Sequence, residues 1–502
     1  MRIVELIKGL APSTVSGPGD TSVSGLHYDS RQVRPGGLFF ALPGAHADGR
    51  DFIPAALANG AVAVVAEGPL SLPDHVAGIV VANARKAMAM AAHRFFDYPL
   101  RGIKVVGITG TNGKTTVCYQ LESIFRAAGK RPAVLGTVNY RFGGMVHEAP
   151  HTTPESVDIL ALIAAFRRAG ADTVIMEISS HGLDQHRVEG FLFDVAAFTN
   201  LTPEHLDYHR DMNSYFAAKR RLFSDFVKPG GGMVFNIDDP YGLRLALAMK
   251  ESTTCGFSSD AALRPAEIHS SFSGTEGVLV TPQGPLQVCS RLFGSYNVSN
   301  LMVAAATALA AGLPVAAVEE GIRTAPQVPG RLERVDNDRG AVILVDYAHT
   351  AEGLQSVLKA LREMAPPRLI TVFGCGGDRD RSKRPRMGKV VAQWSDLVIL
   401  TSDNPRSEDP LAILEEIKEG IRPLGRKERS PEEYRHQPAG AFTSLPERRA
   451  AIAYAVSLAA AGDVLLVAGK GHEDYQIIGA KRLHFDDREE LRKALREDMG
   501  GS

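Results

Sequence analysis

A strand, a glycine-rich loop and a helix follow one another without interruption from Ile103 to Gly129, and this order constrains the fold more than any other feature. The apolar run IKVVGIT, from Ile103 to Thr109, predicts a buried strand, and the segment after Lys114 predicts a helix that Gly129 ends. The same alternation continues downstream. Further strands are expected there at 133–138, 172–178, 195–198 and 233–237, and helices at 156–169 and 297–311. Upstream, the apolar run 61–66 also predicts a buried strand. Alternating strands and helices predict an α/β fold with a mostly parallel sheet.

A second alternating block begins near Ala341 and repeats one design. Each strand-like run ends in charged or glycine residues, as in AVILVDYAH, LITVFGCGGD, DLVILTSDNPR and DVLLVAGKGHE. Ligands of parallel sheets bind at the carboxyl ends of the strands, where these polar loops would lie. The pattern therefore predicts a binding site in this block.

The 502 residues exceed one compact core and suggest about three domains. We place them at residues 1–100, 101–331 and 332–502. Lys and Arg number 56 against 57 Asp and Glu, so the net charge of -1 argues against a protein that wraps nucleic acid. With 44% hydrophobic and 23% charged residues, the composition is that of a globular chain and not of a disordered one.

The four cysteines lie far apart, which argues against a disulfide framework or a zinc knuckle and favours a reducing compartment. The first twenty residues carry Glu5 and Lys8 in their apolar stretch, unlike a signal peptide. Gly312 and Pro314 break the most apolar window, Leu301 to Val318, so a buried helix and a turn are expected there, not a membrane span. We therefore expect a cytoplasmic monomer that binds small molecules, without a nucleic-acid partner.

The glycine-rich loop, GITGTNGKTT, has the residues that a phosphate loop needs. Its glycines let backbone N–H groups turn inward, and the following helix N-terminus favours phosphate. Lys114 would reach the terminal phosphates, and the Thr115 hydroxyl would contact Mg²⁺. The common spacing is kept imperfectly, because Gly107 lies one residue early, and a glycine-rich turn with an exposed lysine is the alternative. The residues predicted to bind the phosphates are Gly110, Thr111, Asn112, Gly113, Lys114, Thr115 and Thr116, and the resemblance described below implies that the phosphates are those of ATP.

Four further residues need to be weighed as metal ligands or charged groups. Glu177 ends a predicted strand, where a carboxylate suits Mg²⁺ but could also be merely solvated. His205 and His209 have the i, i+4 spacing of a zinc pair, without an evident third ligand. Lys219 is followed by Arg220 and Arg221, and by itself this run indicates a solvated basic helix face.

The segment GTNGKTT resembles the ATP loop of the Mur ligase family, which includes folylpolyglutamate synthetase. Similar motifs are MEISSHGL, NLTPEHLDYH, GSYNVSN, GRLE and DYAHT, and the resemblance runs from about Tyr28 to about Gln476. It implies an N-terminal substrate domain, a central ATPase domain and a C-terminal Rossmann-like domain. It also implies ATP-dependent amide formation, in which a substrate carboxylate becomes an acyl phosphate that an amine attacks.

The resemblance also implies roles for individual residues. Lys114, Lys219 and His205 would be catalytic, with His205 near the metal and Lys219 carbamylated to help hold a second Mg²⁺. Metal ligands would be Thr115, Glu177 and the modified Lys219. Further ATP contacts would come from Asn297, Arg331, Asp346 and His349. Ala351 stands where the family usually has proline.

The segment Asp403 to Arg406, DNPR, resembles the signature of members that add meso-2,6-diaminopimelate to UDP-N-acetylmuramoyl-L-alanyl-D-glutamate. Arg406 could hold the distal carboxylate of diaminopimelate with two hydrogen bonds, and lysine lacks that group. A simple Asn-Pro turn is the alternative. The implied amino-acid site comprises Arg379, Asp403, Asn404, Pro405, Arg406, Gly469 and Glu473, with Glu473 pairing with the distal ammonium.

The nucleotide-sugar peptide would be held by residues of the first two domains. By resemblance these are Tyr28, Ser30, Ala45, His46, Ala47, Thr152, Thr153, Ser179, Gln185 and Arg187. The run from Thr152 to Glu155 also fits a helix capping box with Pro154 in the first turn. His151 stands where a close relative carries asparagine.

Three functions remain open from the sequence. The first is the diaminopimelate-adding ligase. The second is a ligase of the same family that adds lysine or resembles folylpolyglutamate synthetase; the DNPR segment argues against lysine, and the N-terminal region of about 100 residues argues against the folate enzyme. The third is a nucleotide-dependent binding switch that joins nothing.

Overall fold

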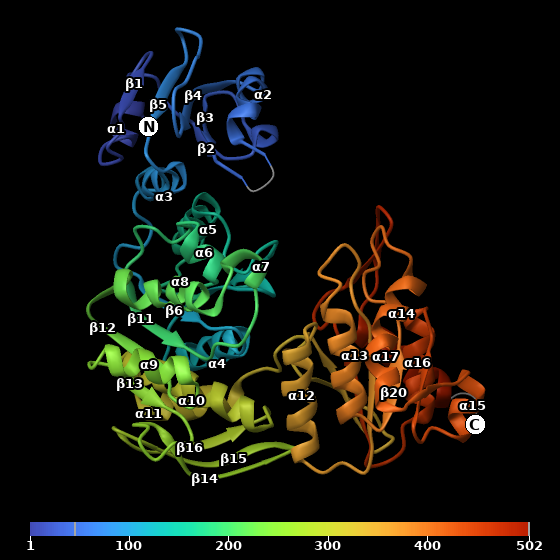
Figure 1. The fold of residues 1–502 in the computed structure, drawn as a ribbon. Coiled ribbons are helices and arrows are strands. Elements are labelled where there is room, and N and C mark those ends of the chain that lie inside the picture. The colour runs from blue at the N-terminus through green and yellow to red at the C-terminus, as the bar shows by residue number, and fades with distance from the viewer. Residues whose placement is uncertain (45–46, 500–502) are drawn as a thin grey trace. The chain divides into compact units, whose positions relative to one another are not determined.

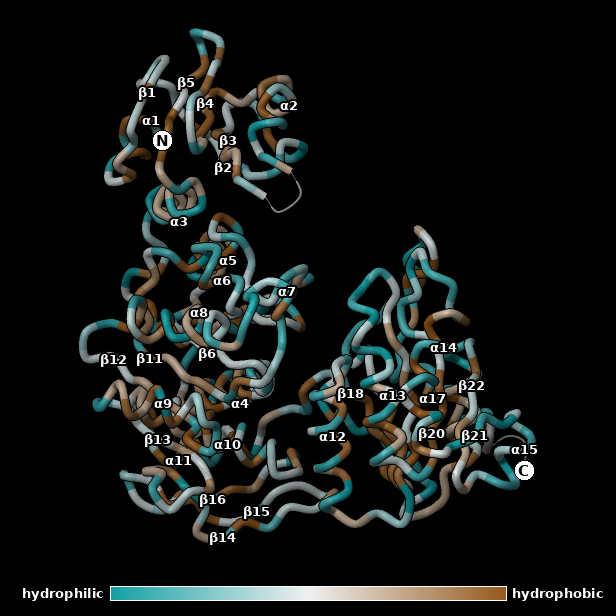
Figure 2. Tube along the Cα trace, viewed as in Figure 1, coloured by the Kyte–Doolittle hydropathy of each residue, from teal (hydrophilic) through white to brown (hydrophobic). Residues whose placement is uncertain are grey.

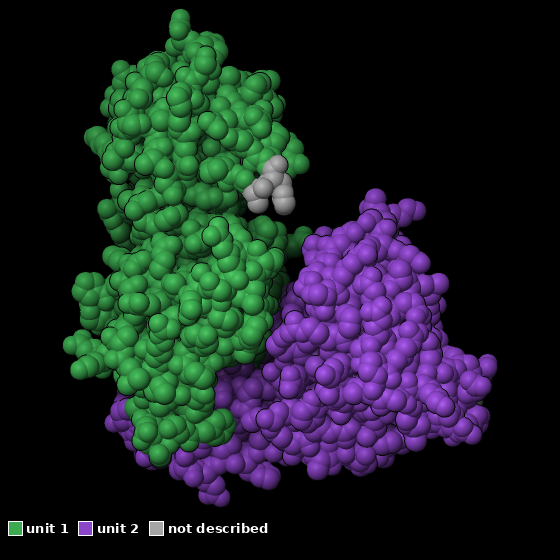
Figure 3. Space-filling view, viewed as in Figure 1, with its two compact units in different colours: residues 1–263, 303–321 green, residues 264–302, 322–502 purple. Residues whose placement is uncertain are grey.

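The computed structural model describes residues 1–44 and 47–499, so the predicted substrate contacts Ala45 and His46 lie outside the described residues. The chain divides into two compact units, which Figure 3 colours separately. Unit 1 comprises residues 1–263 and 303–321, and unit 2 comprises residues 264–302 and 322–502. Each unit has the α/β architecture expected from the alternating pattern (Figure 1).

Unit 1 begins with a five-stranded sheet in the order β1-β5-β4-β3-β2. Its strands are β1 (Thr14–Ser16), β2 (Gly25–His27), β3 (Gly37–Ala41), β4 (Ala61–Ala66) and β5 (Ala77–Val80). Only β1 pairs antiparallel within it. The accompanying helices are α1 (Ile3–Leu6), η1 (Ser30–Gln32), η2 (Gly49–Phe52), α2 (Ile53–Ala58) and α3 (Ala84–Phe95).

The larger sheet of unit 1 has eight strands in the order β13-β12-β11-β6-β10-β7-β8-β9. They are β6 (Lys104–Thr109), β7 (Pro132–Leu135), β8 (Asn139–Phe142), β9 (Met145–Glu148), β10 (Thr173–Glu177), β11 (Phe193–Phe198), β12 (Val227–Asn236) and β13 (Thr253–Cys255). All pairs from β13 to β7 are parallel, so the carboxyl ends of β6, β10 and β11 meet at one edge.

Helices cover this sheet. They are α4 (Lys114–Ala127), α5 (Ser156–Arg168), α6 (Ser180–Asp184), α7 (Leu206–His209), α8 (Met212–Asp225) and α9 (Pro240–Ala248), and the sequence ranges of α10 (Ser295–Ala310) and α11 (Val315–Thr324) run across the boundary between the units. Helix α10 and the turn after it confirm the interpretation of Leu301 to Val318 as a buried helix followed by a turn. Among the described residues, no helix is both long and apolar enough to cross a membrane.

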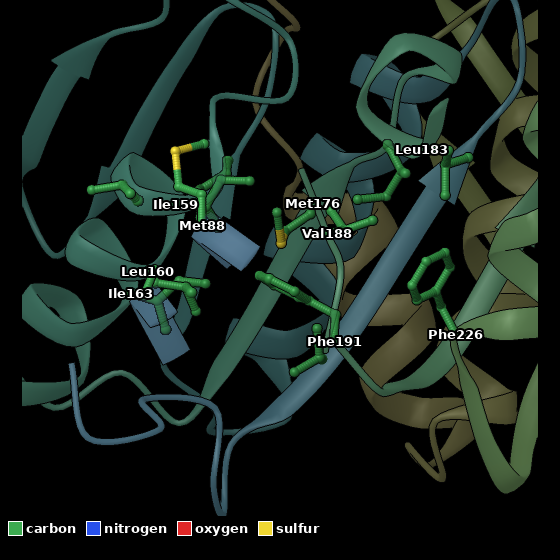
Figure 4. Packing of buried hydrophobic residues seen from close by; sticks show 14 of the residues in the cluster. Met88, Ile159, Leu160, Ile163, Met176, Leu183, Val188, Phe191 and Phe226 are labelled. Atoms are coloured by element: carbon green, nitrogen blue, oxygen red, sulfur yellow. The ribbon is translucent and has the colours of Figure 1, made fainter. Parts of the chain in front are cut away.

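One apolar cluster joins α3 and α5 to one face of the larger sheet (Figure 4). Alternate strand residues such as Val174 and Met176 point into it, as the twofold repeat of a strand requires. Hydrophobic residues concentrate in the strands, and hydrophilic ones in the loops around them (Figure 2). This core fixes the strand ends from which the phosphate loop projects.

Phe191→Ala should lower the free energy of unfolding by about 3–5 kcal/mol, because the ring is fully enclosed and its loss leaves a cavity. Phe191 is buried and makes an edge contact with His93 at a centroid distance of 5.3 Å. The neighbouring Leu192 is exposed, so Leu192→Ala is a matched control with an expected change within about 0.5 kcal/mol. Denaturant unfolding followed by circular dichroism measures both; equal effects would contradict the assigned packing.

Unit 2 contains three sheets. An antiparallel sheet is formed by β14 (Arg264–Ser271), β15 (Gly274–Thr281) and β16 (Gly284–Ser290), and a hairpin by β24 (Tyr475–Ile478) and β25 (Lys481–His484). The main sheet has the order β17-β18-β23-β19-β20-β22-β21, and only β17 is antiparallel in it. Its strands are β17 (Glu333–Val335), β18 (Val342–Asp346), β19 (Leu369–Phe373), β20 (Leu397–Leu400), β21 (Lys427–Glu428), β22 (Ala441–Ser444) and β23 (Val464–Ala468).

The helices of unit 2 follow these strands. They are α12 (Ala351–Glu363), α13 (Lys383–Trp394), α14 (Pro410–Ile421), η3 (Arg422–Leu424), α15 (Pro431–His436), α16 (Arg448–Leu458) and α17 (Asp487–Met499). The four repeated segments of the sequence become β18, β19, β20 and β23, which are neighbours in one parallel sheet. Their polar loops therefore share its carboxyl edge, as predicted.

Candidate functional site

The phosphate loop connects β6 to α4 at the carboxyl edge of the larger sheet of unit 1. Gly110 has φ +147°, and a Cβ there would lie 1.9 Å from the Thr199 hydroxyl oxygen, so no larger residue fits. Gly113, with φ +88°, turns the chain into the first turn of α4. Lys114 Nζ donates to the carbonyl oxygens of Gly110 at 2.9 Å and Thr111 at 2.8 Å. The ammonium therefore lies over the loop, where a phosphate would need it.

Glu177, at the end of the adjacent strand β10, faces the same loop. Its Oε2 accepts from the Thr115 hydroxyl at 3.1 Å and from the Thr137 hydroxyl at 2.9 Å, and its Oε1 accepts from the Thr137 backbone N–H at 2.9 Å. The carboxylate is buried. A buried carboxylate and a hydroxyl at a phosphate loop are the oxygen donors that Mg²⁺ prefers, so the residues fit that ion.

Lys219 points into the protein and not to solvent, although it lies in a basic run. Its Nζ donates to Gly110 O at 2.9 Å and lies 4.8 Å from the centre of the Tyr215 ring. Only 1% of the residue is exposed, whereas the adjacent Arg220 is exposed. Burial, and then the nearby Lys114 ammonium, lower the pKa of Lys219 well below its usual value. The interpretation as a solvated basic face is therefore wrong for Lys219.

Three histidines lie beside one another, and two of them, His205 and His209, interact electrostatically with Lys219. The ring of His181 lies 4.8 Å from that of His205 and 5.5 Å from that of His209, centre to centre. His209 Nε2 lies 2.9 Å from the Ser180 hydroxyl. Burial, and then the two neighbouring rings, lower the pKa of His181 to about 4, and burial also lowers the pKa of His205. In the described part of the chain, no group of three or more His, Cys, Asp or Glu side chains could hold a metal.

Several predicted nucleotide-sugar contacts form one hydrogen-bonded network. The Thr153 hydroxyl donates to Glu177 O and accepts from Ser179 N–H, both at 2.9 Å. Arg187 donates to Thr153 O at 2.7 Å and to Gln185 Oε1 at 2.8 Å. The network ties the predicted substrate residues to the strand end that carries Glu177.

The predicted capping box at Thr152 is wrong. Helix α5 begins at Ser156, its N-cap is Glu155, and no side chain caps it. The Thr152 hydroxyl instead pairs with the Thr137 hydroxyl at 3.0 Å. A tertiary partner therefore outcompetes the local cap.

Three of the predicted contacts in the first hundred residues lie in the described part of the chain: Tyr28, Ser30 and Ala47. The Tyr28 hydroxyl donates to Asp158 Oδ2 at 2.5 Å, and burial raises the pKa of Tyr28. Ser30 is buried and Ala47 is exposed. Within the described residues, no side-chain hydrogen bond joins Ser30 to another predicted contact. The carbonyl of His151, and not its ring, accepts from Tyr140.

In unit 2, the DNPR segment follows β20 and meets the loop after β23. Asn404 Nδ2 donates to Glu473 Oε2 at 3.0 Å, and Gln476 Nε2 donates to Asp403 O at 2.7 Å. Gly469, between β23 and Glu473, has φ +116° and donates its N–H to Asp346 O at 3.0 Å. Five of the seven predicted amino-acid contacts therefore adjoin one another: Asp403, Asn404, Pro405, Gly469 and Glu473.

Arg406 completes this group from the same loop. It adopts φ +53°, and its Nη1 donates to Gly377 O at 2.7 Å. The side chain of Arg379 is exposed and donates to Asp378 O at 3.2 Å. Both guanidinium groups thus come from the loops that follow β19 and β20, the edge at which ligands of parallel sheets bind.

The predicted nucleotide contacts of unit 2 also have defined partners. Asp346, at the end of β18, accepts from the backbone N–H groups of Leu332 at 2.7 Å and Ala348 at 2.8 Å. Burial raises the pKa of Asp346, and Arg331 acts in the opposite direction. Asn297 Nδ2 donates to Phe293 O at 2.9 Å, and His349 Nδ1 lies 3.0 Å from Tyr347 O. Helix α12 begins at Ala351 with Thr350 as its cap, so the missing proline leaves the helix start intact.

Family models match three stretches of the chain. They are the Mur ligase family catalytic domain over residues 22–96, the Mur ligase middle domain over 108–308 and the Mur ligase glutamate ligase domain over 330–471. A protein of Geobacter metallireducens named UDP-N-acetylmuramoyl-L-alanyl-D-glutamate--2,6-diaminopimelate ligase is 51% identical over 504 residues, which cover 99% of each chain. This chain belongs to the Mur ligase family.

Solved Mur ligase structures share the fold. A structure of UDP-N-acetylmuramoyl-L-alanyl-D-glutamate--2,6-diaminopimelate ligase matches with a TM-score of 0.69 at 32% identity and covers 99% of this chain and 100% of that one. The MurF ligase of Thermotoga maritima in complex with ADP matches with a TM-score of 0.62 at 17% identity and covers 96% of this chain and 98% of that one. The family is ATP-dependent, in agreement with the phosphate loop.

Sequence reasoning missed residues that hold the site of this Mur ligase together. Thr137 gives Glu177 two hydrogen bonds, and Lys470 contacts three of the predicted amino-acid residues. Arg384, which is fully buried, bonds Gly376 O and Glu408 beside Arg406. No local motif marks Thr137 or Arg384, whereas Lys470 lies inside the segment DVLLVAGKGHE, which the sequence already singles out.

Proposed function

We propose that this Mur ligase joins meso-2,6-diaminopimelate to UDP-N-acetylmuramoyl-L-alanyl-D-glutamate with ATP, as the name of its Geobacter metallireducens relative states for that protein. The observation that carries the proposal is the DNPR loop, which presents the Arg406 guanidinium in the same cluster as the Glu473 carboxylate. Diaminopimelate has a carboxylate and an ammonium on its distal carbon. One positive and one negative group match that pair, whereas lysine has no distal carboxylate for Arg406 to bind.

The phosphate loop supports the first half of the proposed reaction. Lys114 neutralises charge on the transferred phosphoryl group, and the Gly110 to Gly113 backbone holds the phosphates. Thr115 and Glu177 would hold Mg²⁺, which would supply positive charge to offset that of the phosphates. The substrate carboxylate becomes an acyl phosphate, the amine of the diamino acid attacks its carbonyl carbon, and phosphate leaves. In this proposal the enzyme accelerates both steps by positioning the reactants and neutralising charge, and no protein side chain acts as a nucleophile.

We also propose that Lys219 is carbamylated. Only a neutral amine attacks carbon dioxide, and the lowered pKa of this buried lysine leaves more of it neutral at neutral pH. The carbamate would add an anion next to Lys114 and His205 and offer a second Mg²⁺ an oxygen ligand. Mass spectrometry of the active, undenatured enzyme at neutral pH should detect the added group. An unmodified amine in fully active enzyme would refute the modification.

The proposal has three further parts. They are three domains at residues 1–100, 101–331 and 332–502, a monomeric state, and a role in building cell-wall precursors in the cytoplasm. The nucleotide-sugar peptide would contact the Thr153–Arg187 network and Tyr28, and the adenine nucleotide would also contact Asn297, Arg331, Asp346 and His349.

Glu177→Gln should lower kcat about 100-fold and raise the Mg²⁺ concentration needed for half-maximal activity, because it removes a charged ligand. Glu251, exposed in the same unit, gives a matched control in Glu251→Gln, which should change neither quantity. A Mg²⁺ titration of the initial rate measures both. An unchanged Mg²⁺ dependence in Glu177→Gln would remove Glu177 from the metal site.

A comparison of two amino-acid substrates tests the proposed specificity for meso-diaminopimelate. The purified enzyme receives ATP, the nucleotide-sugar dipeptide and either meso-diaminopimelate or L-lysine, and both ADP and the joined product are measured. We expect kcat/KM for diaminopimelate to exceed that for lysine at least about 100-fold, since lysine has no distal carboxylate to form the charge-assisted contact with Arg406. Faster turnover of lysine would indicate the lysine-adding alternative. ADP release without a joined product would indicate a nucleotide switch.

A further inference from the structure

A fully buried ammonium group lies at the centre of the predicted amino-acid site. Lys470 follows β23 and is 0% exposed. Its Nζ donates to Tyr475 O at 2.6 Å and to Asn404 Oδ1 at 3.1 Å. The same Nζ lies 3.3 Å from Asp403 Oδ1 and 3.8 Å from Glu473 Oε2. One cation therefore contacts three of the residues assigned to the diamino acid, without being assigned to it.

Lys470 also sets the orientation of the Asn404 side chain. Asn404 Oδ1 accepts from Lys470 Nζ and from the backbone N–H of Ile477 at 2.9 Å, and both of these groups can only donate. The amide oxygen must therefore face them, and the Nδ2 group must face Glu473 Oε2, to which it donates at 3.0 Å. Lys470 thus orients the Asn404 amide, and the Asn404 amide in turn holds the Glu473 carboxylate through its hydrogen bond.

The charge of Glu473 depends on this arrangement. Burial first, and then the Asp403 carboxylate, raise the pKa of Glu473, while Lys470, the Asn404 hydrogen bond and Arg406 act in the opposite direction. The other titratable groups that interact with Glu473 are Tyr347, Arg448 and Tyr475. Two carboxylates share the field of a single contacting ammonium, so removing it would favour the neutral acid.

We propose that Lys470 is a positioning residue that keeps Glu473 ionised and aimed at the ammonium group of the incoming diamino acid. This inference rests on the proposed function, in which Glu473 receives that ammonium. Lys470 itself need not touch the substrate, because its effect passes through Asn404 and through the electric field of its charge. A Glu473 side chain that took up a proton would no longer recognise a cation at neutral pH.

The test compares Lys470→Met with wild type by measuring KM for all three substrates and the pH profile of kcat/KM for meso-diaminopimelate. At neutral pH the KM for diaminopimelate should rise about 10- to 100-fold, while those for ATP and the nucleotide-sugar dipeptide should change less than about threefold. Without the cation the pKa of Glu473 rises, so the acidic limb of the profile should move to higher pH by at least about one unit. The control Lys427→Met changes an exposed lysine of the same unit and should leave every value unchanged.

Asp403→Asn gives a prediction of opposite sign and also decides the case if Lys470→Met does not fold. Removing the like charge should lower the pKa of Glu473, so the acidic limb should move to lower pH while Lys470 stays in place. An unmoved limb in a folded variant, or an equal rise of KM for all substrates in Lys470→Met, would overturn the proposal. Wild-type enzyme that makes no joined product would instead refute the proposed function, so the two failures are distinguishable.

Discussion

Lys114→Ala should lower kcat by about 1000-fold or more, which is the largest effect expected of any substitution in unit 1. The ammonium lies over the phosphate loop, bonded to Gly110 O and Thr111 O, and Lys219 donates to the first of these carbonyl oxygens from the interior. Alanine removes the positive charge that the phosphoryl group needs as it is transferred. Initial rates of ADP release at saturating substrate concentrations measure the loss.

Binding separates this effect from a general loss of structure. Isothermal titration calorimetry should give a Kd for the nucleotide-sugar dipeptide within about threefold of wild type, because Lys114 is not part of the Thr153–Arg187 network. Lys130→Ala, which changes an exposed lysine just after the same helix, should keep full activity. If Lys114→Ala bound the dipeptide much more weakly, the two sites would not be separate as assigned.

Arg406→Ala should raise the KM for meso-diaminopimelate about 100-fold and the KM for ATP less than about threefold. Truncating one partner of a charge-assisted, two-bond contact costs several kcal/mol, and the uncompensated carboxylate of the ligand accounts for much of it. Arg406→Lys should recover only part of the affinity, since an ammonium cannot form the same pair of parallel hydrogen bonds. Steady-state kinetics with each substrate varied in turn measure the three constants.

The exposed Arg492 on α17 provides the matched control, and Arg492→Ala should leave all three KM values unchanged. The backbone of Arg406 is held by Ile477 O and Gly479 N–H, which do not depend on its side chain, so the loop should keep its shape in Arg406→Ala. Equal increases of KM for diaminopimelate and ATP would place Arg406 outside the amino-acid pocket.

Local patterns in the sequence were sufficient for the elements that carry the site. The strand from Ile103, the loop glycines and the helix from Lys114 were predicted within a residue or two, because apolar runs and glycine punctuation act locally. The parallel order of β18, β19, β20 and β23 also followed from the repeated strand-to-polar-loop design. The resemblance to the family then supplied residue roles that spacing alone could not.

Features that depend on distant partners were not predictable in the same way. The capping box at Thr152 failed because the Thr152 hydroxyl pairs with Thr137, from the turn between β7 and β8, and the adjacent Thr153 hydroxyl donates to the Glu177 carbonyl oxygen. Lys219 was different, since a signal existed: Tyr215, Leu222 and Phe223 lie at helical spacing around it and mark its face as buried. The charges of the adjacent Arg220 and Arg221 instead favoured the interpretation of a solvated basic face.

The central claim is that ATP converts a substrate carboxylate into an acyl phosphate before the amide bond forms, and isotope transfer tests this most directly. The nucleotide-sugar dipeptide is labelled with oxygen-18 in the reacting glutamyl carboxylate and incubated with enzyme, ATP and meso-diaminopimelate. One labelled oxygen should leave with each inorganic phosphate, because the carboxylate oxygen that attacks ATP departs with the phosphoryl group. Joined product formed together with unlabelled phosphate would contradict the account.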